Sequence, residues 1–397
     1  MSVEVGGREG LSKGEFNRLV SSGRIISVGS SSRDLRPILV GEGVSTKVNA
    51  NVGTSTGKCD LKLEVAKAEA AVSAGADAIM DLSVGGDLDK VRRTLLKKIP
   101  IPLGTVPVYQ VYFESKFDMN LDSILNVIER QARDGVDFMT IHAGITQSFL
   151  KSMRKRIIPI TSRGGGFIAS WMLKHGRENP LYTGFDQILE VLKEYGVCLS
   201  LGDALRPGAI ADAHDDCQIG ELKILGKLTE RAWSAGVQVM VEGPGHVPIH
   251  MIEQDVVLQK KICHGAPYYV LGPLVTDIGL GHDHITSAIG GAIAASAGAD
   301  FLCYVTPSEH LGLPDIEDVR QGVVASKIAA HAGDIAKYGD MEKDIEMSRA
   351  RRKLDWEKMF DQALDPQIAK KYSCLTSKKE CSMCGEYCVL KLLEEDK

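Results

Sequence analysis

Short apolar runs that favour β-strands alternate with amphipathic helical patterns along most of this chain. The alternation runs from residue 47 to about residue 310, and patterns such as LKLEVAKAEAAVSAG have apolar residues at helical spacing and close on glycine. This order predicts a parallel sheet whose strands are joined by crossover helices. The strand candidates are KVNANVG, ADAIMDLS, PLGTVPVY, DFMTIHAG, IIPITSRG, VCLSLGDA, VQVMVEGPGH, YYVLGPLVTD and DFLCYVTP.

The ends of these strands favour an α/β fold of the (β/α)8 TIM-barrel type over the alternative, a doubly wound open sheet. Nine candidates are one too many for eight strands, so one of them is expected to be an extra strand or a loop. Nearly all of them end in polar or glycine-rich residues, and in a barrel those ends converge on one mouth, where active sites are built. The residues concerned are Asn51, Met80, Asp81, Tyr109, His142, Ser162, Arg163, Gly164, Asp203, Glu242, His246 and, beyond the last strand, His310.

The pattern divides the chain into four segments. Residues 1–46 form a small N-terminal region, and residues 47–314 form the barrel. Residues 315–372 are C-terminal helices: one is expected over 315–337, and MEKDIEMSRARRKLDWEKMFDQAL reads as a second helix that Pro366 ends. Residues 373–397 form a cysteine-bearing tail.

Composition excludes several classes of function. The formal net charge of −5 argues against a surface that binds nucleic acid. The N-terminal residues lack the apolar core of a signal peptide, and no apolar run reaches the length of a membrane span. The sequence therefore predicts a cytoplasmic protein with a sizeable core, since 44% of its residues are hydrophobic.

Two mouth motifs suggest bound anions and metal. The glycines of TSRGGG let backbone amides approach an anion while Arg163 supplies further donors, although a simple turn explains this motif as well. EGPGH and TPSEHLGLP place His246 and His310 on rigid loops, with Glu242 beside the first. Two such imidazoles suit a metal site with open positions, although structural histidines are the commoner case.

The chain ends in a cysteine cluster, CSMCGEYC. Nine cysteines in a chain of this size make a poor disulfide framework. Cys381, Cys384 and Cys388 suit either zinc, with Cys374 as a fourth ligand, or an iron–sulfur cluster. Three cysteines without a fourth leave one iron of a [4Fe–4S] cluster open, as in enzymes that bind S-adenosylmethionine there.

Taken together, the motifs resemble the phosphomethylpyrimidine synthase family, radical S-adenosylmethionine lyases of thiamine pyrimidine biosynthesis. The resemblance extends from RDLRP to the terminal cysteines. It rests on KVNANVGTS, MDLSVGGD, GTVPVYQ, IHAG, SRGG, SLGDALRPG, VEGPGHVP, LGPLVTDI, CYVTPSEHLGLP and CSMCG.

The resemblance implies a role for each matching position. His246 and His310 match the ligands of a second metal, zinc or iron, and the three terminal cysteines match the [4Fe–4S] ligands. Glu242 and these cysteines are the expected catalytic residues. The residues that match the aminoimidazole ribotide site are Asn51, Met80, Tyr109, His142, Ser162, Arg163, Gly164, Asp203, Ala204, Leu205, Arg206, Glu242 and Tyr269.

The family's chemistry implies cofactors and partners. An electron from the cluster, supplied by a flavodoxin or ferredoxin type of donor, cleaves S-adenosylmethionine to a 5′-deoxyadenosyl radical. The radical converts aminoimidazole ribotide to hydroxymethylpyrimidine phosphate, with formate and carbon monoxide as co-products. The resemblance also implies a homodimer in which each cluster tail reaches over the neighbouring subunit's mouth.

A second product stays open. The family's long form has four residues between its last two cluster cysteines and DGLR in the turn, whereas this chain has three residues and Ala204. Both differences leave room for the paralogous hydroxybenzimidazole synthase, which uses the same ribotide. A non-enzymatic zinc or electron-transfer protein is the remote alternative.

Overall fold

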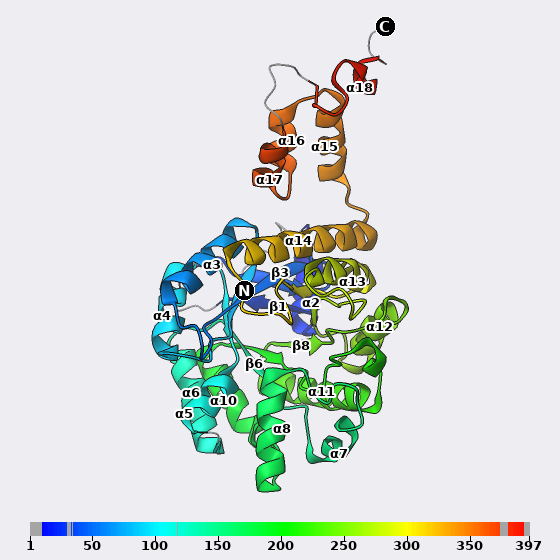
Figure 1. Ribbon diagram of the computed structural model, residues 1–397. Helices are drawn as coiled ribbons and strands as arrows, with labels where there is room; N and C mark the ends of the chain where they lie inside the picture. Colours follow the sequence, from blue (N-terminus) through cyan, green and yellow to red (C-terminus); the bar gives the residue numbers. More distant parts are fainter. Residues whose placement is uncertain (1–9, 30–32, 34, 117, 374–379, 393–397) are drawn as a thin grey trace. The chain divides into compact units, whose positions relative to one another are not determined.

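A computed structural model describes residues 10–29, 33, 35–116, 118–373 and 380–392 of this chain (Figure 1). The chain forms two compact units, residues 1–337 and residues 338–397. The finer division into four segments stays a prediction.

Eight parallel strands close into a barrel in the first unit, which confirms the predicted fold class. Neighbouring strands follow the order β10-β3-β4-β5-β6-β7-β8-β9, so the last strand closes against the first. The strands are β3 (Lys47–Val52), β4 (Ala78–Asp81), β5 (Leu103–Thr105), β6 (Phe138–Ile141), β7 (Cys198–Leu201), β8 (Val239–Gly243), β9 (Tyr268–Leu271) and β10 (Phe301–Cys303).

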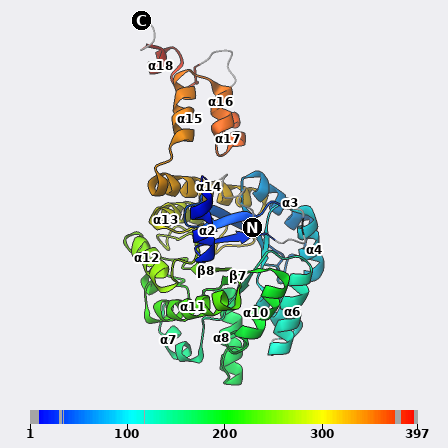
Figure 2. The ribbon, with the colours of Figure 1, turned by 180° about the vertical axis from the view of Figure 1, so that it is seen from behind.

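Helices surround this barrel on the outside, as the views in Figure 1 and Figure 2 agree. Aspartates begin several of them; the Asp60 side chain, for example, accepts hydrogen bonds from two amides at the start of α3. Gly196 and Gly236 end α10 and α11 in the left-handed conformation that glycine adopts most easily. The helices are α3 (Leu61–Ser73), α4 (Leu88–Lys98), α5 (Pro107–Glu114), α6 (Leu121–Arg133), α7 (Leu150–Met153), α8 (Arg163–His175), α9 (Pro180–Thr183), α10 (Phe185–Tyr195), α11 (Asp216–Ala235), α12 (Ile252–Ile262), α13 (Asp283–Ala297) and α14 (Ile316–Tyr338).

The surplus strand candidate is IIPITSRG, which is a loop. The amides of Ile157 and Ile158 donate to the two carboxylate oxygens of Asp212, both at 3.0 Å, and are therefore paired with a side chain rather than with a strand. A second correction concerns PLGTVPVY, where the strand ends at Thr105. Pro107 begins α5 at a position that needs no amide donor, so Tyr109 lies on a helix and not at a strand end.

Aromatic side chains fill the barrel below its mouth. The rings of Phe138 and Phe301 meet edge to face with centroids 6.4 Å apart, and Tyr269 packs on Phe301 at 4.5 Å. Gly104 on β5 makes room for this layer, because a Cβ there would lie 2.2 Å from the Phe138 ring. The barrel interior is thus a packed core that supports whatever binds above it.

Carboxylates join neighbouring strands at the amino end of the barrel. Asp77, Asp137 and Asp300 each stand just before a strand and accept the amide of a residue on the adjacent strand, at 2.7 to 2.8 Å. Each also pairs with a cation: Lys327, Arg33 and Lys260 respectively. We call these three aspartates the floor carboxylates; each links two neighbouring strands and a cation at this end of the barrel.

A small hairpin precedes the barrel. It consists of α2 (Lys13–Ser21) and the antiparallel strands β1 (Ile25–Val28) and β2 (Ile38–Gly41), with a separate cluster of buried apolar side chains. The amide of Ser27 donates to the side chain of Gln238 at 2.8 Å, just before β8. This contact ties the hairpin to the amino end of the barrel.

The second unit is helical, but its helices differ from the prediction. The helix expected over MEKDIEMSRARRKLDWEKMFDQAL is broken at Leu354, whose φ is 53°, and Asp355 begins a new helix. Pro366 starts a helix instead of ending one, since it follows the capping residue Asp365. The helices are α15 (Glu342–Arg352), α16 (Trp356–Gln362), α17 (Pro366–Tyr372) and α18 (Val389–Leu392).

Among the described residues, none of the helices combines the length and the apolar character that crossing a membrane requires.

Candidate functional site

A cavity lies at the mouth of the barrel. The residues around it come from six of the eight strands, from α5 and from the segments that follow the strands. It is lined by Asn51, Met80, Leu82, Val106, Tyr109, Thr140, His142, Asp203, Arg206, Glu242, Gly243, Tyr269, Val270, Leu271 and Cys303. We call it the mouth cavity.

The structure brings most of the predicted substrate-binding residues together at this cavity. Ser162, Gly164, Ala204 and Leu205 do not line it, and Arg163 lines a neighbouring cavity instead. The predicted residues that line the mouth cavity are Asn51, Met80, Tyr109, His142, Asp203, Arg206, Glu242 and Tyr269.

Glu242 is a partly buried residue whose carboxyl group is held by two hydroxyl groups. Its Oε1 atom accepts hydrogen bonds from Oγ1 of Thr140 at 2.8 Å and from Oγ of Ser200 at 3.1 Å. Burial raises the pKa of Glu242, while the positive charge of Arg206 and these hydrogen bonds act in the opposite direction. A carboxyl group that lines a cavity and has a raised pKa can give a proton to a ligand or take one from it.

Asp203 and Arg206 form an ion pair across the turn that follows β7. Nη1 of Arg206 lies 3.0 Å from Oδ1 of Asp203, and burial raises the pKa of Asp203 well above its ordinary value despite this neighbour. Oδ2 of Asp203 and Nε of Arg206 are buried and have no hydrogen-bond partner in the described chain. Buried polar atoms are normally paired, so these two point to a polar ligand.

His142 lies between two glycines. A Cβ on Gly164 would come within 2.5 Å of the imidazole ring, and one on Gly202 within 2.9 Å, so larger residues would displace the ring. Burial, followed by the charge of Arg206, lowers the pKa of His142 to about 3. Its Nδ1 atom is the third buried polar atom at the cavity without a partner.

The SRGG motif forms the first turn of α8. Oγ of Ser162 accepts the amide of Gly165 at 3.2 Å, which begins the helix there. The guanidinium of Arg163 lies 5.3 Å from the centre of the Tyr109 ring, and it donates to the carbonyl oxygen of Leu82 at 3.3 Å. The motif thus contacts residues of the mouth cavity, although it does not line that cavity itself.

Several residues at the cavity were not predicted from the sequence. Nδ2 of Asn49 donates to Asn51 and to the Tyr269 hydroxyl, both at 2.8 Å, and Nδ2 of Asn51 lies 3.1 Å from Sγ of Cys303. Thr140 and Ser200, which hold Glu242, were missed as well. A signal for Thr140 and Ser200 was present in the sequence, because each is a polar residue within a short apolar strand. Such a residue in a fully buried strand indicates the barrel interior.

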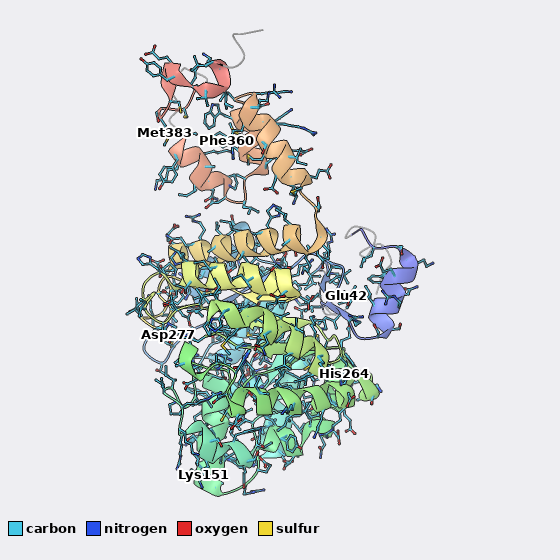
Figure 3. All side chains as sticks on the ribbon, turned by 90° about the vertical axis from the view of Figure 1, so that its right-hand side faces the viewer. Glu42, Lys151, His264, Asp277, Phe360 and Met383 are labelled. Carbon is cyan, nitrogen blue, oxygen red and sulfur yellow. The ribbon has the colours of Figure 1, made fainter. Side chains whose placement is uncertain are left out.

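The two predicted metal-binding histidines face each other. The ring centroids of His246 and His310 are 5.2 Å apart. Nδ1 of His246 lies 2.8 Å from Asp277, a residue labelled in Figure 3, and Nδ1 of His310 lies 3.4 Å from Asp283. Carboxylates at Nδ1 orient the rings and leave both Nε2 atoms for another partner, as in many metal sites.

A second cavity adjoins the first and shares Asn51 and Leu82 with it. Glu309 and His310 line it, together with Arg163 and Lys67. Lys67 is fully buried, and its Nζ atom lies 2.6 Å from Oε1 of Glu64. This cavity therefore lies between His310, one member of the histidine pair, and the mouth cavity.

The three terminal cysteines lie within one short turn of the second unit, next to Met383 (Figure 3). Cys381 and Cys384 are partly exposed, whereas Cys388 is buried. Backbone amides of Cys384 and Met383 lower the pKa of Cys381, and the Cys381 charge raises the pKa of Cys384, so these two sulfurs are neighbours. Soft thiolates are the ligands of an iron–sulfur cluster, and backbone amides can donate hydrogen bonds to its sulfur atoms. Cys374, the candidate fourth ligand of zinc, lies outside the described residues.

No three His, Cys, Asp or Glu side chains converge as a ready metal site within the part of the chain that the structure describes. The histidine pair supplies two ligands only, and a metal there would take its others from elsewhere.

Comparison with known proteins gives a consistent result. The model of the family described as "Radical SAM ThiC family" matches residues 2–395. A phosphomethylpyrimidine synthase of Thermoanaerobacter sp. (strain X514) is 54% identical over 98% of this chain and 91% of that protein. A protein of the same name from Moorella thermoacetica is 50% identical over 99% of this chain and 94% of its own length.

Proposed function

Because the chain belongs to the radical SAM ThiC family, we propose that it converts 5-aminoimidazole ribotide to 4-amino-5-hydroxymethyl-2-methylpyrimidine phosphate with release of formate and carbon monoxide. The observation that carries this proposal is the mouth cavity with its three unpartnered polar atoms, on His142, Asp203 and Arg206. A small ligand rich in hydroxyl, amino and phosphate groups would supply the missing partners. High identity to phosphomethylpyrimidine synthases supports the same reaction.

The chain's own residues act on the ribotide in three ways. Arg206, positively charged and partly buried, attracts an anionic group, and Asp203 accepts from hydroxyl or amino groups. His142 stays neutral at physiological pH because its pKa is lowered, and it therefore offers both a donor and an acceptor. Glu242, with its raised pKa, holds or releases a proton beside the substrate. The predicted residues Asn51, Met80, Tyr109 and Tyr269 complete the walls.

We assign the cofactors from the donor sets. Cys381, Cys384 and Cys388 would hold the [4Fe–4S] cluster, which supplies the electron for cleavage of S-adenosylmethionine. His246 and His310 would hold a zinc or iron ion through their Nε2 atoms, and the second cavity beside them is the space available for S-adenosylmethionine. A flavodoxin or ferredoxin type of protein would supply the electron, and a second copy of the chain would complete the working enzyme as a homodimer.

The identity of the product tests the reaction. The anaerobically reconstituted, reduced protein is incubated with aminoimidazole ribotide and S-adenosylmethionine, and the products are identified by mass. Hydroxymethylpyrimidine phosphate together with carbon monoxide is the expected result. A hydroxybenzimidazole would show instead that the chain is the paralogous synthase, and a colourless protein with one zinc per chain that resists reconstitution would exclude the radical reaction.

The histidine pair is tested separately by metal analysis. Replacement of His246 by Ala is expected to remove the second metal, to leave the cluster absorbance unchanged, and to lower turnover severely. Normal metal content with near-normal turnover in this variant would show that the imidazoles are structural.

A further inference from the structure

Glu221 is a buried acid on α11, outside the barrel strands, that the proposed reaction does not use. Its side chain is 2% exposed. Its Oε1 atom accepts the amide of Ala204 at 3.0 Å and its Oε2 atom accepts the amide of Leu205 at 2.6 Å. One carboxylate thus holds two consecutive amides of the turn that follows β7.

The turn held in this way carries two residues of the mouth cavity. Asp203 precedes the two amides and Arg206 follows them, and both line the cavity, whereas the buried side chains of Ala204 and Leu205 do not. Because the held amides lie between Asp203 and Arg206, their position sets the direction of both side chains. Glu221 therefore sets the direction of the two atoms of this ion pair that have no partner, Oδ2 of Asp203 and Nε of Arg206.

Two glycines leave the space that this arrangement needs. A Cβ on Gly144 would lie 2.7 Å from Cγ of Glu221, and a Cβ on Gly165 would lie 2.6 Å from the carbonyl oxygen of Ala204. Gly144 belongs to the segment after β6, and Gly165 to the first turn of α8. The turn is therefore enclosed between Glu221 on one side and α8 on the other.

We propose that Glu221 is a positioning residue for the ribotide: its carboxylate fixes the turn at Ala204 and Leu205 so that Asp203 and Arg206 meet the ligand in one orientation. This assignment rests on the proposed function for the identity of the ligand. Glutamine at this position has the same shape, but its side-chain oxygen can accept a hydrogen bond from only one of the two backbone N–H groups. Its NH₂ group would face the other N–H group. The turn would then have to rotate, and Arg206 would rotate with it.

The test measures equilibrium binding of aminoimidazole ribotide by calorimetry, on the full chain without cluster, so that no turnover is involved. Glu221→Gln is expected to weaken binding about 10-fold or more, the scale for loss of an acceptor that holds a binding group. Asp300→Asn is the matched control, because it also removes a buried carboxylate that accepts a backbone amide, but at the other end of the barrel. The control is expected to lower the melting temperature and to leave the ribotide affinity unchanged.

A double-mutant cycle shows whether Glu221 acts through Arg206. In the background of Arg206→Ala, the further change Glu221→Gln is expected to weaken binding less than it does in the wild-type protein, because one of the two side chains that Glu221 positions is gone. Additive losses would overturn the proposal, and so would an unchanged affinity of the single variant Glu221→Gln.

A second variant covers the case in which Glu221→Gln does not fold. Gly144→Ala keeps the carboxylate but displaces it, and it is expected to weaken ribotide binding as well; wild-type affinity in this variant would count against the proposal. Wild-type protein that binds no ribotide would instead overturn the proposed function, and this inference with it.

Discussion

The two ends of the barrel use the same type of residue in different ways. At the amino end, each floor carboxylate (Asp77, Asp137 and Asp300) accepts an amide of the adjacent strand and pairs with a cation. At the mouth, burial raises the pKa of Asp203 and Glu242, and one oxygen of Asp203 has no partner. The floor carboxylates are thus paired with both an amide and a cation, whereas Asp203 at the mouth keeps one oxygen without a partner in the described chain.

This difference separates stability from function along one axis of the molecule. A buried acid with a cation and an amide contributes to the fold, and its removal leaves groups unpaired. A buried acid whose pKa is raised by desolvation lowers the stability of the fold. Such an acid is therefore expected to bind a ligand or to exchange a proton. Substitutions at the two ends should therefore affect different measurements.

The largest effect is expected at Glu242. Glu242→Gln keeps the shape but removes the ionisable group, and we expect turnover to fall by about 10²-fold to 10⁴-fold, the range for loss of a general acid or base. The melting temperature should stay the same or rise, because a desolvated carboxyl group is removed. Product formation under single-turnover conditions and thermal unfolding are measured on the same preparation. A fall in stability with unchanged turnover would mean that the mouth acid behaves like a floor acid.

The next effect concerns Gly164 and Gly166, which flank Gly165 in the first turn of α8. Gly164→Ala would place a Cβ 2.5 Å from the His142 ring, and we expect it to weaken ribotide binding about 10-fold by turning the imidazole away. Gly166→Ala is the matched control, because the nearest atom to its Cβ would be 4.0 Å away. The control should gain up to about 1 kcal/mol of stability from helix propensity and bind normally. Calorimetry and thermal unfolding of both variants measure the difference, and equal affinities would show that His142 does not touch the ligand.

A smaller effect is expected at the amino end. Asp300→Asn removes the carboxylate that pairs with Lys260 and weakens the link to the Tyr268 amide, so we expect a loss of about 1–3 kcal/mol in the free energy of unfolding. The turnover of the folded fraction should not change. Denaturant unfolding measures the loss, and assays below the transition measure turnover. A variant with full stability but reduced turnover would contradict the division between the two ends.

Much of this fold could be predicted from the sequence, because most barrel strands are short apolar runs and most of the long helices have apolar residues at helical spacing, several with a capping residue at one end. The failures occurred where one residue overrides the pattern. At Pro107 a helix begins where the pattern predicts the end of a strand. The amides of Ile157 and Ile158 donate to Asp212 instead of to a neighbouring strand. Leu354 breaks a long amphipathic pattern through its left-handed backbone, which the alternation of charges does not indicate.

The site was partly predictable for a related reason. Residues at strand ends reach the mouth whatever the details of packing, so Asn51, His142, Asp203 and Glu242 could be expected to meet there. The roles of Thr140, Ser200 and Glu221 could not, because Thr140 and Ser200 are single polar residues inside buried strands and Glu221 is one of many polar residues on α11. Their roles depend on which atoms they meet across the barrel, and the sequence does not contain that information in any local pattern.

The smallest effect concerns the pH dependence of His142, whose Nδ1 atom is one of the unpaired atoms at the mouth. Its pKa is lowered from 6.5 to about 3, so between these values the unfolded chain binds a proton that the folded chain does not. The contribution of this ring to stability is therefore complete above pH 6.5 and is lost as the pH falls toward 3. Above pH 6.5 the ring is neutral and its part in ribotide binding should not vary. Nitrogen NMR of histidine-labelled protein, with the His142 signal assigned by its loss in His142→Gln, should show a neutral ring at pH 5. A ring that titrates near 6.5 would be solvated like a surface group, and the mouth would then lack the buried, unpaired character that distinguishes it from the amino end.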